Sequence, residues 1–171
     1  RNLSNFLAMV VSTGIGGGLF VDGRLLDGGD GNAGHIGHVI VEPEGADCAC
    51  GSRGCLEAEA SGPAISRRLG GDPSTAGAQE KRRAGMLVGR AVASAVNLLD
   101  LEHVLIGGSV ALGFGDEFFA AANMELFERC HLDFSRGVRI SPVGLGAEAP
   151  LVGAAVVGFR SLGIDARTRS I

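Results

Sequence analysis

The run Phe6-Leu-Ala-Met-Val-Val-Ser12 is apolar at every position before its serine, and a glycine cluster from Gly14 to Gly18 stops it. A continuous apolar run that ends in glycine is typical of a buried strand. A second apolar stretch, Gly16 to Val21, is followed by Asp22-Gly23 and then by Arg24-Leu-Leu26. An Asp-Gly pair between two apolar runs favours the type I′ turn of a two-residue hairpin. The sequence therefore predicts antiparallel strands at the start of the chain.

Beyond the hairpin, helices and single strands alternate. A loop rich in Gly, Asp and Asn covers 27–37, and the chain turns helical from Leu56 onward. We expect strands at 39–41, 104–106 and 138–141, and helices at 61–69, 79–99, 117–132 and 151–162. Strands first, followed by helices that alternate with single strands, predict an α/β architecture in which helices flank a mixed sheet.

The composition is that of one folded domain. With 171 residues, 46% of them hydrophobic and 20% charged, the chain can bury enough apolar surface to offset the entropy of ordering it. A formal net charge of -4 argues against a nucleic-acid surface. We therefore interpret two basic runs, Arg67-Arg68 and Lys81-Arg-Arg83, as solvated helix faces.

Targeting signals and a disulfide framework are both missing from the sequence. No segment holds the ~18 successive apolar residues of a membrane helix, and the N-terminal residues do not read as a signal peptide. Three of the four cysteines crowd into Cys48 to Cys55, which is a poor layout for disulfides. We expect a cytoplasmic protein that does not engage a membrane.

The strongest chemical signal is Cys48-Ala-Cys50-Gly-Ser-Arg-Gly-Cys55, which follows His38 by ten positions. Three thiolates and one imidazole complete the tetrahedral shell of a structural zinc and leave no position for water. The loop from Glu44 to Gly54 has almost no other apolar residue, so the metal would hold it in one shape. Two other interpretations of these residues are small buried cysteines beside an unrelated histidine, or redox-active thiols.

Two glycine-rich turns favour a nucleotide. In Ser12-Thr-Gly-Ile-Gly-Gly-Gly18, successive backbone N–H groups could converge on phosphate oxygens, with the Thr13 hydroxyl as a further donor. In Val104-Leu-Ile-Gly-Gly-Ser-Val110, a strand leads into glycines that would let a nucleotide approach the backbone. Each run has an alternative interpretation as a tight bend or a packing turn, without any ligand.

Polar side chains flank the predicted zinc. A metal that fixes both segments would hold His38 and Glu57 in one cleft, where a polyhydroxyl ligand could form hydrogen bonds with both. His35, taken alone, is interpreted as a histidine of an exposed loop.

Together these motifs resemble the signature of the ROK family, named for repressors, open reading frames and kinases. The match consists of Thr13-Gly-Ile-Gly-Gly-Gly18, Gly31-Asn-Ala-Gly34, His38 and Cys48-x-Cys50-Gly-x-x-Gly54-Cys55-Leu-Glu57. It is ordered over 10–62 and continues more diffusely to about residue 162.

The resemblance implies an actin-like, ribonuclease-H-like fold of two lobes, ATP- and Mg²⁺-dependent phosphorylation of a hexose, as in glucokinases, and a homodimer. It also implies roles for single residues. His38 binds zinc and reaches the sugar, and Glu57 binds sugar hydroxyls. Thr13 and Gly14 approach the nucleotide phosphates, whereas Gly107 and Gly108 lie near the adenosine.

Two departures from the family pattern shape the functional hypothesis. His35 stands where the family's kinases usually have Glu, which affects sugar preference. The kinases' first phosphate loop and catalytic aspartate precede the Thr13 motif and are not in this chain, so 1–171 is expected to be a C-terminal lobe, inactive alone. The alternatives are the sugar-sensing domain of a ROK transcriptional repressor, in which this lobe itself contacts no nucleic acid, and a zinc-stapled interaction module without a ligand.

Overall fold

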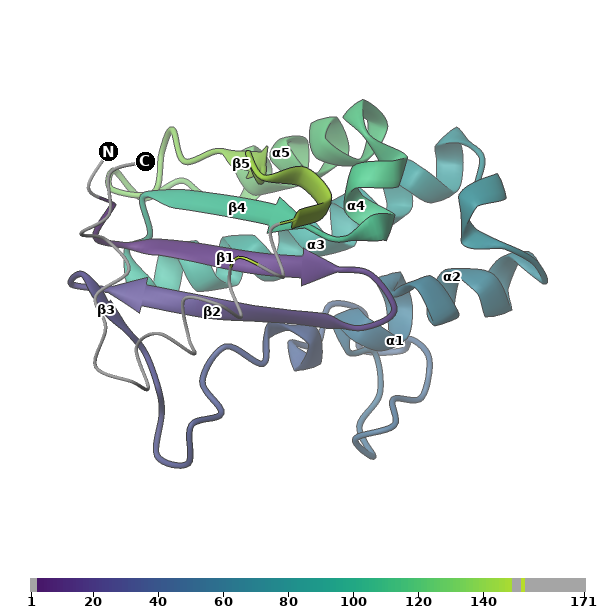
Figure 1. Cartoon of the computed structure of the whole chain (residues 1–171), viewed down its shortest axis with the longest axis horizontal. Coiled ribbons are helices and arrows are strands. Elements are labelled where there is room, and N and C mark those ends of the chain that lie inside the picture. Colours follow the sequence, from purple (N-terminus) through teal and green to yellow (C-terminus); the bar gives the residue numbers. More distant parts are fainter. Residues whose placement is uncertain (1–2, 149–151, 153–171) are drawn as a thin grey trace.

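A computed structural model describes residues 3–148 and Val152, and within them one mixed sheet forms the centre of the fold (Figure 1). The strands are β1 (Phe6–Val11), β2 (Ile15–Val21), β3 (Arg24–Leu25), β4 (His103–Gly107) and β5 (Ile140–Pro142). They lie in the order β3-β2-β1-β4-β5. β1 pairs antiparallel with β2 and parallel with β4, so the predicted mixed sheet is confirmed.

The helices are α1 (Leu56–Ala60), α2 (Gly62–Leu69), α3 (Ala78–Leu99), α4 (Ser109–Phe114) and α5 (Asp116–Arg129). Short 3-10 turns lie at Ile36–His38 (η1), Pro73–Thr75 (η2) and Gly146–Glu148 (η3). α3 and α5 lie behind the sheet in Figure 1, whereas α1, α2 and α4 gather beyond the end at which β1 points. None of the helices in this described part is long and apolar enough to cross a lipid bilayer.

The hairpin forms as the Asp-Gly pair predicts. Val21 pairs with Arg24 across the turn. Asp22 and Gly23 have φ values of 52° and 71°, and a type I′ turn requires positive φ at both central residues. The turn at Asp22-Gly23 therefore fixes the register between β2 and β3.

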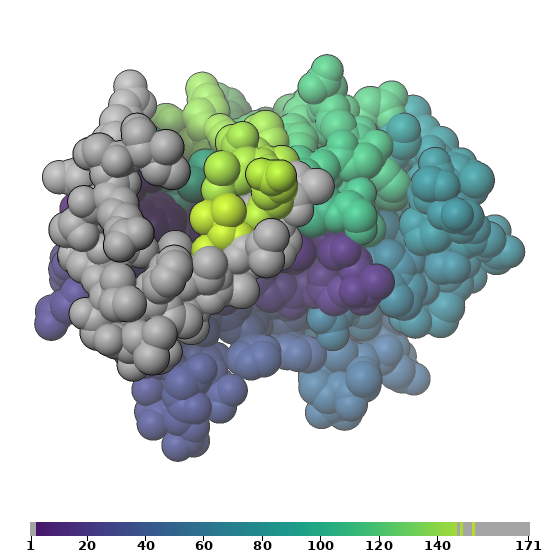
Figure 2. Space-filling view, in the orientation of Figure 1, coloured from purple at the N-terminus to yellow at the C-terminus, as the bar shows by residue number. Residues whose placement is uncertain are grey.

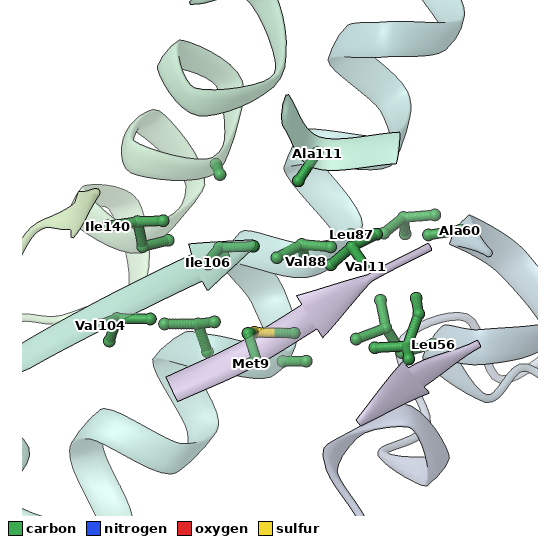
Figure 3. Close-up of a cluster of buried hydrophobic side chains, with 14 of the residues drawn as sticks. Met9, Val11, Leu56, Ala60, Leu87, Val88, Val104, Ile106, Ala111 and Ile140 are labelled. Carbon is green, nitrogen blue, oxygen red and sulfur yellow. The ribbon is translucent and has the colours of Figure 1, made fainter. Parts of the chain in front are cut away.

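The core lies between the sheet and α3. Along β1, Leu7, Met9 and Val11 are buried, because alternate side chains of a strand point to the same face. Leu87 and Val88 of α3 meet this face (Figure 3). Each such side chain contributes about 1.5–3 kcal/mol by leaving water, so these contacts anchor the sheet on its longest helix.

The packing of α5 on α3 depends on two glycines. An ideal Cβ at Gly85 would lie 2.2 Å from the backbone oxygen of Phe118, and one at Gly89 would lie 2.4 Å from that of Ala122. Both atoms belong to the backbone of α5 and cannot rotate away. The missing side chains therefore set how closely the two helices approach.

Two parts of the described chain differ from the secondary structure that the sequence predicts. The strand expected at 39–41 is wrong, because its partner segment begins α1 at Leu56 and leaves only an isolated bridge between Ile40 and Cys55. The sequence also missed α4, because glycines precede, interrupt and follow it. The helix expected at 151–162 lies, except for Val152, outside the described residues.

We predict that Gly85→Ala lowers the free energy of unfolding by about 1–3 kcal/mol, because the added methyl group forces α5 away from α3. Urea denaturation of the wild type and the variant measures the difference. Gly113→Ala is the matched control, since it is also a helical glycine but has open space around it. The control should match or exceed wild-type stability. Equal stability of all three proteins would contradict the packing argument.

Candidate metal centre and ligand site

Four side chains from two loops converge on one point. The Nδ1 or Nε2 atom of His38 and the sulfurs of Cys48, Cys50 and Cys55 all lie within 4.8 Å of one another. His38 is the last residue of η1, and Cys55 caps the N-terminus of α1. The loops at 27–35 and 44–54 protrude along the lower edge of the molecule in Figures 1 and 2. The structure thus brings together the four side chains that the cysteine spacing singled out.

The distances fit a tetrahedral ion rather than a disulfide. The Cys48 sulfur lies 3.7 Å from His38 Nδ1, and the sulfurs of Cys50 and Cys55 are 3.7 Å apart. Ligands at about 2.3 Å for sulfur and 2.0–2.1 Å for nitrogen stand about 3.5–3.8 Å apart around a tetrahedral ion, whereas a disulfide needs about 2.05 Å. All four cysteines are free thiols, so the donor set and its spacing suit a thiophilic divalent metal.

The pKa values of the Cys50 and Cys55 thiols are shifted in opposite directions. Burial raises the pKa of the Cys55 thiol to about 11, so the thiolate is disfavoured there without a compensating cation. A hydrogen bond to the Ser52 backbone holds the pKa of the exposed Cys50 thiol below its usual value. Metal binding requires thiolates, and the positive charge of a bound cation would stabilise the negatively charged sulfur of Cys55 in its buried position.

The cysteine loop is held by backbone hydrogen bonds rather than by a core. Cys48 N–H donates to the Ser52 carbonyl at 2.8 Å, and Gly51 N–H donates to the Cys48 carbonyl at 3.0 Å. Gly54 has a φ of 70°, and an ideal Cβ there would lie 1.7 Å from the Glu42 carbonyl oxygen. Only glycine fits at position 54, so the chain can reverse just before Cys55.

Glu57 connects this loop to the first glycine-rich turn. Its Oε2 accepts a hydrogen bond from Ile15 N–H at 2.8 Å, two residues along the chain from Thr13. An ideal Cβ at Gly14 would lie 3.1 Å from the same oxygen. The carboxylate two residues after Cys55 therefore lies against the turn in which we expect nucleotide phosphates.

The histidines of the preceding loop lie together. The ring centroids of His35 and His38 are 5.9 Å apart, and both residues are exposed. Their segment packs on β2, because an ideal Cβ at Gly37 would lie 2.2 Å from the Ile15 carbonyl oxygen. His35 is thus both exposed, as its isolated position predicted, and adjacent to the candidate metal ligand His38.

The second glycine-rich turn meets the first. Gly108 has a φ of 98°, and an ideal Cβ there would lie 2.3 Å from the Val11 carbonyl oxygen. The hydroxyls of Ser12 and Ser109 are 2.8 Å apart. Beside them is a pocket of about 590 Å³ whose lining includes Thr13, Ser66, Asp72 and Ser109. Gly107 ends β4, and Gly108 leads from it into Ser109 at the start of α4. Ser109 is a polar residue of the pocket wall that the sequence did not identify.

The model of the ROK family matches residues 1–158. The chain belongs to the ROK family. It is 40% identical over 126 residues to an N-acetylmannosamine kinase from Yersinia pestis, a match that covers 65% of this chain and 43% of that relative. The chain thus spans less than half the length of this relative.

Solved structures agree on the fold. A ROK hexokinase from Thermus thermophilus is 32% identical with a TM-score of 0.76, covering 94% of this chain and 59% of the hexokinase. A ROK transcriptional regulator, a homologue of E. coli MLC protein, is 26% identical with a TM-score of 0.71, covering 82% of this chain and 42% of the regulator. The expected actin-like ROK fold is confirmed.

Two arginines of the basic runs are not fully solvated, contrary to the prediction from the sequence. Arg68 and Arg83 are only about one third exposed, and both contact Glu59. Arg68 also forms an ion pair with Glu80. Glu59 itself is buried and accepts a hydrogen bond from Ala46 N–H at 2.5 Å. Burial alone would raise the pKa of Glu59, but the Ala46 N–H and the two arginines hold it below its usual value.

We predict that Cys50→Ser removes the metal and lowers the melting temperature by about 5–10 °C, because ligand binding no longer stabilises the folded loop. A chelator should lower the melting temperature of the wild type to a similar extent and leave the variant unchanged. Elemental analysis should find about one divalent metal per wild-type chain. Cys130→Ser, outside the cluster, should keep the response to chelator. An unchanged melting curve for Cys50→Ser would contradict the metal site.

Proposed function

We propose that this ROK chain is the sugar-binding C-terminal lobe of an ATP-dependent hexose kinase of the glucokinase-like type. The single observation that carries the proposal is the 2.8 Å hydrogen bond between Ile15 N–H and the Glu57 carboxylate. It brings the sugar-binding candidate Glu57 next to the turn that we assign to phosphate. A hydroxyl that Glu57 orients would then lie near the phosphoryl donor, and such positioning supplies most of the rate in phosphoryl transfer.

In this proposal the metal is a structural zinc held by His38, Cys48, Cys50 and Cys55. Three sulfurs and one nitrogen at tetrahedral spacing favour zinc over harder cations, which prefer oxygen. Four protein ligands leave no position for a reacting water, so the ion shapes the site and takes no part in the chemistry. Thiol ligands persist in a reducing compartment, which supports a cytoplasmic location.

The hexose is proposed to bind beside the metal, to His38, His35 and Glu57. A carboxylate and imidazoles offer the acceptors and donors that vicinal hydroxyls require. The similarity to an N-acetylmannosamine kinase and to a ROK hexokinase supports a hexose as the ligand class.

ATP and Mg²⁺ are proposed to bind at the pocket next to Ser12 and Ser109. Thr13 and Gly14 would contact the phosphates, and Gly107 and Gly108 would lie near the adenosine. We assign no catalytic base within this lobe, because Glu57 is occupied in orienting the sugar. Phosphoryl transfer then requires residues of the other lobe.

A homodimer is part of the proposal. Met124 and Phe127 of α5 are 69% and 68% exposed, and large exposed apolar side chains on one helix face are typical of association surfaces.

A second candidate function is the sugar-sensing domain of a ROK repressor. It is favoured by the similarity to the transcriptional regulator, which covers 82% of this chain. Sensing needs the sugar site and the metal but no nucleotide, so nucleotide binding separates the two candidates. Neither candidate involves nucleic acid at this lobe.

We predict that Glu57→Gln weakens hexose binding at least tenfold. The amide oxygen can still accept from Ile15 N–H, so the turn keeps its shape while the sugar loses a charged acceptor. Calorimetric titration with N-acetylmannosamine, glucose and N-acetylglucosamine measures the effect, and the melting temperature checks the fold. Glu102→Gln is the control, because Glu102 is an exposed carboxylate just before the start of β4, away from Gly107. This variant should bind like the wild type. Equal affinity of the two variants would count against Glu57 as a sugar ligand.

We also predict that the chain binds a Mg²⁺-loaded, non-hydrolysable ATP analogue, and that Thr13→Val weakens this binding several-fold through loss of a hydroxyl donor. The same calorimetric cell compares analogue and hexose. The variant should keep wild-type hexose affinity, which serves as its internal control. Hexose binding without any binding of the analogue would favour the repressor function over the kinase.

A further inference from the structure

Glu59 is a buried carboxylate beneath the cysteine loop, with 3% of the residue exposed. Its Oε1 accepts from Ala46 N–H at 2.5 Å, and its Oε2 accepts from Arg83 Nη2 at 2.6 Å. Its backbone carbonyl accepts from Arg68 Nη2 at 2.8 Å and from Arg83 Nη1 at 3.1 Å. The residue therefore joins the cysteine loop to both α2 and α3.

Ala46 connects the start of the cysteine loop both to its end and to Glu59. Its N–H donates to Glu59, and its carbonyl accepts from Gly54 N–H at 2.8 Å. Ala46 lies two residues before Cys48, and Gly54 lies directly before Cys55. The pair of hydrogen bonds on Ala46 therefore fixes the separation between the first two cysteine ligands and the third.

Glu59 and Cys55 belong to the same turn of helix. Glu59 N–H donates to the Cys55 carbonyl at 3.2 Å, so a shift of one residue moves the other. The contact with the loop is also tight, because an ideal Cβ at Gly45 would lie 2.2 Å from Glu59 Oε1. The loop can approach the carboxylate only with glycine at position 45.

Stability alone is a poor reason for an ion pair at this place. Burying a carboxylate costs several kcal/mol, and its attraction to two partly exposed guanidinium groups often does no more than offset this cost. An apolar residue at position 59 could fill the space but could not accept a hydrogen bond from Ala46 N–H. What the carboxylate contributes is a directional, charge-assisted hydrogen bond to the loop backbone.

We propose that Glu59 is a positioning residue of the metal site, which sets the cysteine loop so that its sulfurs meet Cys55 and His38 at the spacing that the ion requires. Arg83 and Arg68 orient the carboxylate from α3 and α2. Of the proposed function, this inference requires only the metal. It does not depend on the hexose or on ATP.

The rate of metal release tests the proposal. Zinc-loaded wild type, Glu59→Ala, Glu59→Gln and Glu80→Gln are mixed with an excess of a chromogenic chelator, at a temperature at which circular dichroism shows each to be folded. Glu80→Gln is the matched control, because Glu80 also pairs with Arg68 but makes no contact with the loop among the hydrogen bonds and ion pairs of the described residues. Urea denaturation reports the global stability of each protein.

We expect Glu59→Ala to release zinc at least tenfold faster than the wild type. Glu59→Gln, which keeps an acceptor for Ala46 N–H, should recover a large part of the wild-type rate. Glu80→Gln should release zinc within twofold of the wild type, even if its stability falls as far as that of Glu59→Ala. Equal release rates for Glu59→Ala and Glu80→Gln would show that Glu59 is a structural residue only and overturn the inference. Hexose titration of the same samples tests the proposed function separately.

Discussion

The hydrogen bond from Ile15 N–H to Glu57 joins two segments that lie 42 residues apart in the sequence. One is the turn between β1 and β2, which the core of the protein holds rigidly. The other is the first turn of α1, which directly follows the polar cysteine loop at 44–54. Glu57 lies two residues after the candidate metal ligand Cys55. The hydrogen bond from Ile15 therefore fixes the position of the Cys-His cluster relative to the sheet. Sugar and phosphate candidates become neighbours through this contact.

Much of the fold follows from local patterns in the sequence. The hairpin could be predicted because Asp22-Gly23 has one favourable turn geometry, and α3 could be predicted because its apolar residues recur at the helical period. The convergence of His38 with the three cysteines could be anticipated because cysteine at such spacing, in a loop without apolar residues, is typical of a metal site. In each case the determining physics lies within about 20 residues of chain.

The remaining features depend on partners that are distant in sequence. α4 could not be predicted because its glycines weaken helix propensity, and what justifies Gly108 is the Val11 carbonyl from another strand. Arg68 and Arg83 resemble any other surface arginines until α1 places Glu59 between them. Glu59 itself lies two residues after the more recognisable Glu57, and nothing in the local sequence distinguishes a buried carboxylate from an exposed one.

In the proposed function, the closed shell of the metal limits what this part of the protein can do by itself. An ion with four protein ligands has no position at which to activate water or polarise a phosphate, so its effect on chemistry is the placement of His38 and Glu57. Such a site can bind a sugar equally well in a kinase and in a sensor, which is consistent with similarity to both kinds of ROK protein. The two proposed functions then differ at the turn formed by residues 12–14, where Thr13 and Ser109 line the pocket of about 590 Å³. A kinase needs a hexose beside Glu57 and ATP in this pocket at the same time, whereas a sensor needs only the hexose.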